Sequence, residues 1–150
     1  MKNILIAFTL LLFAACNPSN NTKDYTEENE QEILTYLDDN NLTAQKTSSG
    51  LHYIINNAGT GTQATSSNNV TVAYKGYFTN GSVFDESDAS GISFNLQNVI
   101  KGWTEGIPLF KEGGNGVLLI PSSLAYGNSG KGSVPGGAVL VFDVKLISVN

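Results

Sequence analysis

Strand-forming runs separated by turn residues, which begin after Gly50, restrict the fold of this chain more than any other feature. The run at residues 70–78 (VTVAYKGYF) is followed by Asn80-Gly81, a pair that favours a tight hairpin turn. Similar runs occur at residues 51–55 (LHYII), 92–96, 117–120 and 138–149 (AVLVFDVKLISV). Between them, residues 97–110 hold the one stretch of this part that can form a helix. We therefore expect an α+β domain over residues 50–150, with four to six strands around one short helix.

The composition agrees with a β-rich chain and argues against nucleic-acid binding. Only 14% of the 150 residues are charged, and 16 glycines, with many Asn, Ser and Thr, supply turns and surface polarity. The formal net charge is −5, and no segment gathers Lys and Arg as phosphate binding requires. We expect no nucleic-acid partner.

The first fifteen residues have the pattern of a targeting segment. Lys2 precedes an apolar run at residues 4–13 that is too short to span a membrane, and two alanines precede Cys16. The arrangement resembles the lipobox of bacterial lipoproteins, in which the cysteine is acylated at the new N-terminus. We expect a lipoprotein-type signal peptide at residues 1–15, lipid attachment at Cys16 and a polar tether at residues 16–24. The alternative is an ordinary secretory signal in which Cys16 is incidental.

Residues 25–49 form an N-terminal extension with one predicted helix. Glu27 and Glu28 suit its first turn, apolar residues at positions 33, 34, 36 and 37 recur with partial helical periodicity, and Asn40-Asn41 ends the pattern. We expect a helix over about residues 27–39. It could pack on the domain or hang free of it; a role in dimerisation has no support in the sequence.

Ionisable side chains form none of the usual catalytic or metal-binding sets. His52 is the only histidine and Cys16 the only cysteine, which argues against a zinc site and a Ser-His-Asp triad and excludes an intrachain disulfide. His52 lies in an alternating run, and we expect its side chain to be exposed to solvent. Asp85, Glu86 and Asp88 lack the spacing of a calcium loop. We expect neither a metal nor a cofactor.

Several aromatic residues occupy junctions between loops and predicted elements, where burial in the hydrophobic core does not readily explain them. Phe84 follows a predicted turn, Trp103 lies where a loop enters the predicted helix, and Tyr126 opens a Gly-rich loop. Aromatic side chains at such junctions are typical of the wall of a concave binding site.

These aromatics belong to short motifs spread over residues 50–149. In chain order the motifs are Gly50-Leu51, Gly59-Thr60-Gly61, Val72-Ala73-Tyr74-Lys75-Gly76, Asn80-Gly81-Ser82-Val83-Phe84-Asp85, Phe94-Asn95-Leu96, Val99-Ile100-Lys101-Gly102-Trp103, Glu105-Gly106, Ile120-Pro121, Leu124-Ala125-Tyr126-Gly127, Val134-Pro135 and Leu140-Val141-Phe142-Asp143-Val144. Their order resembles that of the FKBP-type peptidyl-prolyl cis–trans isomerases. The resemblance covers about two-thirds of the chain.

The resemblance implies an FKBP-like half-open antiparallel sheet of five or six strands wrapped around one short helix, with a pocket between them. It implies catalytic positions at Tyr74, Phe84, Asp85 and Tyr126. It implies substrate-binding positions at Ile92, Val99, Ile100, Trp103, Val134 and Phe142, with the Trp103 ring as the pocket floor. The alternative for Asp85 is a turn-capping carboxylate. Ile92 departs from the family, which often places an aromatic there, so we expect a thinner wall on that side.

The implied activity is rotation about X-Pro bonds of proteins that fold in the bacterial cell envelope. This reaction breaks no covalent σ-bond, so the lack of an ionisable catalyst fits it. The expected partners are X-Pro-containing polypeptides and, through lipidated Cys16, a membrane surface. The alternative is a non-enzymatic chaperone or proline-peptide binding module anchored to the membrane, which would suppress aggregation even without Phe84.

Overall fold

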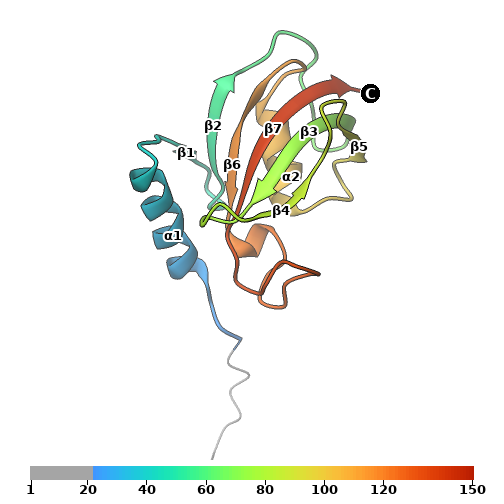
Figure 1. The fold of residues 1–150 in the computed structure, drawn as a ribbon. Coiled ribbons are helices and arrows are strands. Elements are labelled where there is room, and N and C mark those ends of the chain that lie inside the picture. Colours follow the sequence, from blue (N-terminus) through green and yellow to red (C-terminus); the bar gives the residue numbers. More distant parts are fainter. Residues whose placement is uncertain (1–21) are drawn as a thin grey trace, which may run out of the picture.

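The computed structural model describes residues 22–150, and Figure 1 shows the arrangement of the elements. Two α-helices, α1 (Thr26–Asp39) and α2 (Lys101–Gly106), accompany the 3₁₀ turns η1 (Ile107–Leu109) and η2 (Ser122–Leu124). The strands are β1 (Gln45–Lys46), β2 (His52–Asn57), β3 (Asn69–Tyr77), β4 (Val83–Glu86), β5 (Ile92–Asn95), β6 (Asn115–Ile120) and β7 (Leu140–Val149). The segment of the signal peptide and Cys16 lies outside the described residues.

The seven strands form one antiparallel sheet, which confirms the predicted fold class. Its order is β1-β2-β6-β7-β3-β4, and β5 shares the outer edge of β3 with β4. The longest predicted runs form the centre, where β3 pairs with β7 from Val70↔Val149 to Tyr77↔Val141. The two-residue β1 was not predicted; it extends the sheet beyond six strands by pairing with β2.

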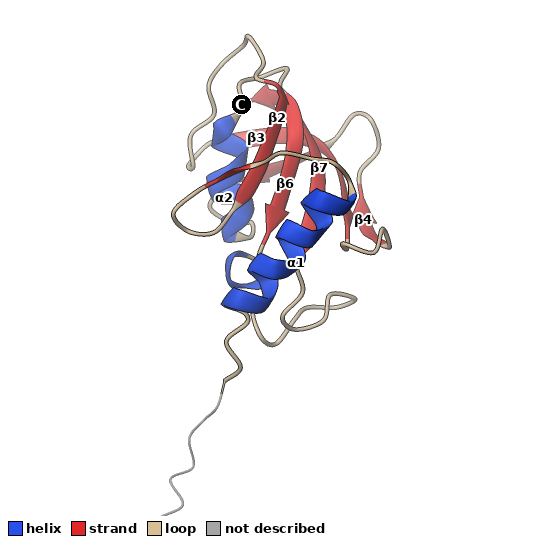
Figure 2. Cartoon of the chain, turned by 90° about the vertical axis from the view of Figure 1, so that its left-hand side faces the viewer, coloured by secondary structure: helices blue, strands red, loops and turns tan. Residues whose placement is uncertain are grey.

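The two α-helices lie on opposite faces of this sheet (Figure 2). Trp103 and Ile107 pack with Leu118 and Phe142 in the larger core cluster, on what we call the α2 face. Ile33 and Leu37 of α1 pack with Leu119, Val139 and Val141 in a second cluster, on the α1 face. Because successive side chains of a strand point to opposite sides, β6 and β7 supply residues to both cores.

The N-terminal extension is therefore docked on the sheet rather than hanging free. Its helix begins one residue before the predicted start, at Thr26, and ends at the predicted Asp39. The N-cap residue Tyr25 makes no side-chain capping bond, but Asp24 Oδ1 accepts a 2.9 Å hydrogen bond from the Thr26 N–H. Hydrogen bonding to the Thr26 side chain, together with this backbone bond, lowers the pKa of the Asp24 carboxyl below its usual value.

The expectation for His52 is wrong, since its side chain is buried with 3% exposure. Alternation puts His52 on the side of β2 opposite to Leu51, and a free-standing sheet would leave that side in water. Here Glu30 of α1 closes over it, and the carboxylate Oε1 lies 3.6 Å from His52 Nε2. Docking of α1, which alternation cannot reveal, is the reason for the burial.

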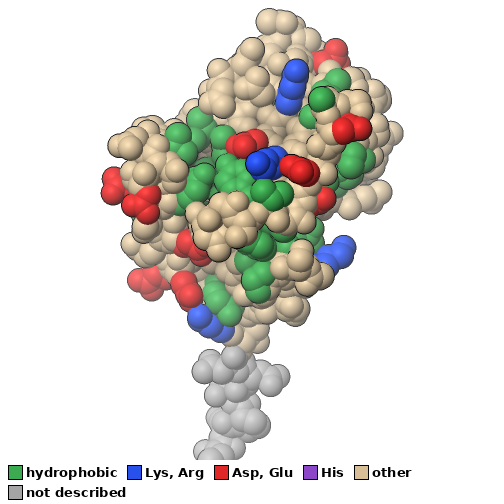
Figure 3. All heavy atoms as spheres, viewed as in Figure 1, with side chains coloured by type: hydrophobic (Ala, Val, Ile, Leu, Met, Phe, Trp, Pro, Cys, Tyr) green, Lys and Arg blue, Asp and Glu red, His purple; other side chains and the backbone are tan. Residues whose placement is uncertain are grey.

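The surface of the described part adds no further site type. In residues 22–150 no helix has both the length and the apolar content to cross a bilayer, and no three His, Cys, Asp or Glu side chains gather as metal ligands. On the face drawn in Figure 3 the basic side chains stand apart from one another, among acidic and apolar ones.

Candidate active site

A cavity of about 610 Å³ opens on the α2 face between α2, the outer strands and the long loop 121–139 that joins β6 to β7. Its residues come from six separated segments of the chain. They are Tyr74, Asp85, Phe94, Asn98, Val99, Ile100, Lys101, Trp103, Ser123, Ala125, Tyr126, Lys131 and Phe142. Most of the wall is apolar or aromatic, with Asp85, Lys101 and Lys131 as the charged members.

Trp103 lies at the centre of an aromatic cluster that faces this cavity. Its ring makes edge-on contacts with Tyr74, Phe94 and Phe142, at centroid distances of 5.1, 5.4 and 5.4 Å. Only 4% of the residue is exposed, and its indole N–H finds no acceptor among the described residues. Packing of aromatic edges against faces, which such rings prefer, therefore holds the indole in place.

The close approach of α2 to the sheet determines how deeply the Trp103 indole is buried. Gly102, the preceding residue, is buried against Ile120, and a Cβ there would come within 2.4 Å of Ile120 Cγ2. A glycine at this position lets the first turn of the helix lie directly on β6. The adjacent indole is thereby brought down to the level of the strand side chains.

A second aromatic layer supports the Phe142 wall. The Phe84 ring lies edge-on to Phe142 at 5.5 Å and is tilted against Phe78 at 5.0 Å. Both Phe84 and Phe142 close over Gly76, where a Cβ would come within 2.7 Å of Phe142 and 2.8 Å of Phe84. The missing side chain at Gly76 makes room for both rings.

Tyr74 and Asp85 join two strands at the mouth of the cavity. The Tyr74 hydroxyl donates a 2.8 Å hydrogen bond to Asp85 Oδ2. Burial, with the nearby Asp85 carboxylate as a second cause, raises the pKa of Tyr74 to about 12. Tyr74 therefore stays neutral and remains a donor at any physiological pH.

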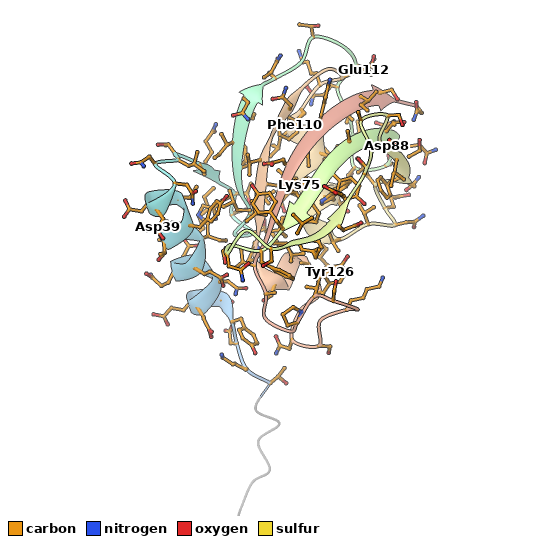
Figure 4. All side chains as sticks on the ribbon, in the orientation of Figure 1. Asp39, Lys75, Asp88, Phe110, Glu112 and Tyr126 are labelled. Atoms are coloured by element: carbon orange, nitrogen blue, oxygen red, sulfur yellow. The ribbon has the colours of Figure 1, made fainter. Side chains whose placement is uncertain are left out.

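The loop 121–139 carries Tyr126, labelled in Figure 4, to the other side of the cavity. The Tyr126 hydroxyl makes no hydrogen bond to another described residue, and Lys131 Nζ lies 5.8 Å from the centre of its ring. Across the cavity, the Ile100 carbonyl accepts bonds from the N–H groups of Trp103 and Thr104, whereas the Ile100 N–H has no acceptor within residues 22–150. The Tyr126 hydroxyl and the Ile100 N–H are thus two donors at the cavity that no described residue uses.

The structure brings together seven of the ten residues predicted for the site. Tyr74, Asp85, Val99, Ile100, Trp103, Tyr126 and Phe142 line one cavity. The other three do not line it, and each has a packing reason. Phe84 lies one layer behind Phe142.

Val134 and Ile92 are not among the residues that line the cavity. Val134 is 6% exposed and belongs to the core cluster on the α2 face, and its backbone pairs with that of Lys131. Ile92 is 44% exposed at the start of β5, opposite Val72, and it is Phe94, two residues further along, that reaches the cavity.

Sequence reasoning missed six lining residues. They are Phe94, Asn98, Lys101, Ser123, Ala125 and Lys131. Phe94, Lys101 and Ala125 stand within the motifs quoted above, although none of the three was among the predicted site residues. Asn98, Ser123 and Lys131 are polar loop residues without a pattern that separates them from other turn residues.

An open antiparallel sheet with an aromatic cavity against one short helix is the architecture expected of FKBP-type prolyl isomerases. Residues 60–147 match the family of FKBP-type peptidyl-prolyl cis-trans isomerases, and the chain belongs to this family. A probable FKBP-type peptidyl-prolyl cis-trans isomerase FkpA of Neisseria meningitidis is 50% identical over 106 residues, which are 69% of this chain and 39% of that protein. FkpA of Escherichia coli K12 is 47% identical over 107 residues, 69% of this chain and 40% of the relative.

Solved structures agree with these relatives. The crystal structure of FkpA from Escherichia coli superposes with a TM-score of 0.74 at 38% identity, over 83% of this chain and 61% of that one. A peptidyl-prolyl cis-trans isomerase from Pseudomonas syringae pv. tomato gives a TM-score of 0.71 at 30% identity, over 86% of this chain and 98% of the other. The chain spans about two-fifths of the length of the curated relatives named above.

Proposed function

We propose that this chain accelerates cis–trans rotation of X-Pro peptide bonds and that the cavity over Trp103 is its active site. The observation that carries the proposal is the Trp103 indole, held by Tyr74, Phe94 and Phe142 at the floor of an apolar cavity in a member of the FKBP-type family. A proline ring is compact and apolar, and an aromatic floor suits it. The seven predicted residues that line the cavity supply its contacts.

Such a cavity meets the demands of the reaction without an acid, a base or a nucleophile. Amide resonance sets a rotation barrier of about 18–20 kcal/mol, and exchange without a catalyst takes tens to hundreds of seconds. A thousandfold acceleration requires only about 4 kcal/mol of differential stabilisation. The twisted amide has lost resonance and is less dipolar than the planar one, so apolar walls disfavour the planar ground state relative to it.

Two hydrogen-bond donors hold the substrate while it rotates. In our proposal the Ile100 N–H and the Tyr126 hydroxyl bind substrate carbonyls, so that one side of the X-Pro bond is fixed and the other turns. Both donors lie at the cavity, and neither is used by another described residue. Phe84 contributes indirectly by supporting the Phe142 wall.

The decisive experiment measures isomer exchange of a short Phe-Pro peptide by NMR, with and without the protein. We expect catalytic amounts of the chain to speed exchange and Trp103→Leu to abolish most of the gain. A folded wild-type chain that leaves the exchange rate unchanged refutes the proposal. Suppression of aggregation that survives in folded Trp103→Leu would instead support the non-enzymatic chaperone.

We further propose that the protein acts in the bacterial cell envelope, anchored through acylated Cys16 to a membrane surface, on X-Pro-containing proteins that fold there. The lipobox-like sequence around Cys16 supports this proposal. Metabolic labelling with palmitate tests it, since label should enter the wild-type chain and be lost in Cys16→Ala. Equal labelling of both chains, or of neither, would contradict the anchor.

A further inference from the structure

A buried asparagine of α1 joins the two ends of the loop that carries Tyr126. Asn29 is 1% exposed. Its Oδ1 accepts a 2.8 Å hydrogen bond from the Ser122 N–H, and its Nδ2 donates a 2.8 Å bond to the Gly137 carbonyl. Ser122 and Gly137 belong to the opposite ends of the loop 121–139, which supplies Ser123, Ala125, Tyr126 and Lys131 to the cavity wall.

The loop continues this connection up to the residue beside Tyr126. The Gly127 N–H donates a 2.8 Å bond to the Ser122 carbonyl, and the Gly137 N–H donates a 2.9 Å bond to the Gly127 carbonyl. Asn29, Ser122, Gly127 and Gly137 therefore form a closed hydrogen-bonded ring. We call these four residues the Asn29 ring. Its only side-chain member is Asn29, which comes from an extension that lies outside the matched family region of residues 60–147.

Two further contacts join the residues just before α1 to the same loop. Gly137 has a φ of +78° and lies against the Tyr25 ring, where a Cβ would approach Tyr25 Cε1 to 2.2 Å. The Asn128 side chain donates a 2.6 Å hydrogen bond to the Lys23 carbonyl. In Figure 2 the start of α1 lies beside this loop, below the sheet. Residues 23–29 thus contact the loop near its beginning, its middle and its end.

We infer that Asn29 is a positioning residue for the proposed isomerase activity: it holds the Tyr126 loop in the conformation that completes the cavity. The inference rests on the proposed function and gives the N-terminal extension a part in it. Without the Asn29 amide, the Ser122 N–H and the Gly137 carbonyl would be buried without partners, and opening the loop to water would relieve that cost. Tyr126 would move with the loop.

The test compares full-length wild type, Asn29→Ala, Asn29→Asp and a control, Leu37→Ala. Leu37 lies in the same helix and is buried against the α1 face, away from the Asn29 ring, so the control weakens helix docking without removing a bond to the loop. Two quantities are measured for each chain: amide exchange at Gly127 and Gly137, relative to the β6 and β7 amides, and kcat/KM for the Phe-Pro peptide.

Asn29→Ala should speed exchange at Gly127 and Gly137 by about tenfold or more, since one lost buried hydrogen-bond partner is enough for that change. It should also lower kcat/KM severalfold. Leu37→Ala should leave both quantities near the wild-type values while global stability falls. Unchanged loop exchange in Asn29→Ala, or equal effects in Asn29→Ala and Leu37→Ala, would overturn the inference.

Asn29→Asp provides a rescue that a merely structural role would not show. Ionised aspartate has no proton to donate to the Gly137 carbonyl, whereas the protonated acid has the shape and the donor of asparagine. Burial and the facing carbonyl raise the pKa of such a carboxyl. Protection and kcat/KM of Asn29→Asp, each divided by the wild-type value at the same pH, should therefore recover as the pH falls. Asn29→Ala should show no recovery. Absence of recovery in Asn29→Asp would contradict the claim that the donor bond of the Asn29 ring holds the loop.

The two measurements separate this inference from the proposed function. A wild-type chain without isomerase activity refutes the function, and with it the positioning role, while the exchange data still decide whether Asn29 holds the loop. If the wild type is active but neither loop amide exchange nor kcat/KM changes when Asn29 is replaced, the positioning role alone is refuted. Because Asn29→Asp at low pH resembles the wild type, a folded variant is available even if Asn29→Ala does not fold.

Discussion

The Tyr74 hydroxyl donates a 2.8 Å hydrogen bond to Asp85 Oδ2 and so links β3 to β4 at the mouth of the cavity. The two residues are eleven apart in the chain and meet because β4 folds back onto β3, with Asp85 opposite Gly76. The bond directs the Tyr74 ring toward Trp103, whose centroid is 5.1 Å away. Asp85 therefore orients a wall residue, and within residues 22–150 the side-chain bond to the preceding turn comes from Asn80 instead.

Alkaline pH should destabilise the protein through Tyr74. Burial raises the pKa of Tyr74 to about 12 in the folded state, against about 10 for an exposed tyrosine. Because the folded state holds the proton more tightly, its stability is constant below about pH 10 and falls as the pH rises toward 12. The pKa of Tyr77 is raised in the same direction, mainly by burial. Urea unfolding over this pH range should show a decline that is shallower in Tyr74→Phe, and stability that rises above pH 10 would contradict it.

Tyr126→Phe should lower kcat/KM about two- to tenfold, the worth of one ordinary hydrogen bond, and leave the free energy of unfolding unchanged. The reason is that its hydroxyl makes no hydrogen bond within residues 22–150 and is free for the substrate. Tyr53→Phe is the matched control, because the Tyr53 hydroxyl is bonded to Gln45, at the other edge of the sheet. Peptide exchange kinetics and urea unfolding measure the two effects. Equal rates for wild type and Tyr126→Phe would remove the hydroxyl from the mechanism.

Gly76→Ala should displace the Phe142 wall of the cavity. The new methyl group would collide with Phe142 and Phe84, and relief of that overlap must displace the Phe142 wall. We expect about 1–3 kcal/mol of lost stability, as for other overpacked cores. The loss of kcat/KM should exceed that of Gly61→Ala, where the added methyl group meets the Glu112 side chain, far from the cavity. Calorimetry and peptide exchange test this, and unchanged turnover in Gly76→Ala would show that Phe142 need not be held in place.

Phe84→Ala should slow turnover through Phe142, although Phe84 does not line the cavity. The ring is half-buried, so the stability loss should be about 1–3 kcal/mol, less than for a fully buried phenylalanine. Phe78 packs against Phe84 and makes no ring contact with Phe142, so Phe78→Ala should cost similar stability with a smaller loss of kcat/KM. If the two variants lose activity in proportion to stability alone, Phe84 has no specific role in the wall.

Much of the fold and most of the candidate site could be predicted from local patterns. The Asn80-Gly81 turn and the alternating runs at residues 70–78 and 138–149 correspond to β3 and β7 at the centre of the sheet. Aromatics at junctions, such as Trp103 and Tyr126, meet in the cavity. These signals are local, because turn geometry and side-chain alternation depend on neighbours within a few residues.

Other features had no local signal. His52 is buried because α1 docks over β2, and Val134 is buried in the core cluster on the α2 face. Phe94 rather than Ile92 reaches the cavity because of where β5 lies along β3. Asn29 resembles any polar residue of an acidic helix until its two partners, 93 and 108 residues away, are seen.

The sequence by itself determined the central strands, their turns, the place of both helices and the aromatic motifs that identify the family. The tertiary structure alone decided which aromatics form the wall and which support it, and that α1 is joined to the Tyr126 loop. The physical reason is the range of the interactions. Backbone conformation and alternation are set by adjacent residues, whereas burial, register and the satisfaction of a buried amide depend on segments that meet only when the chain is folded.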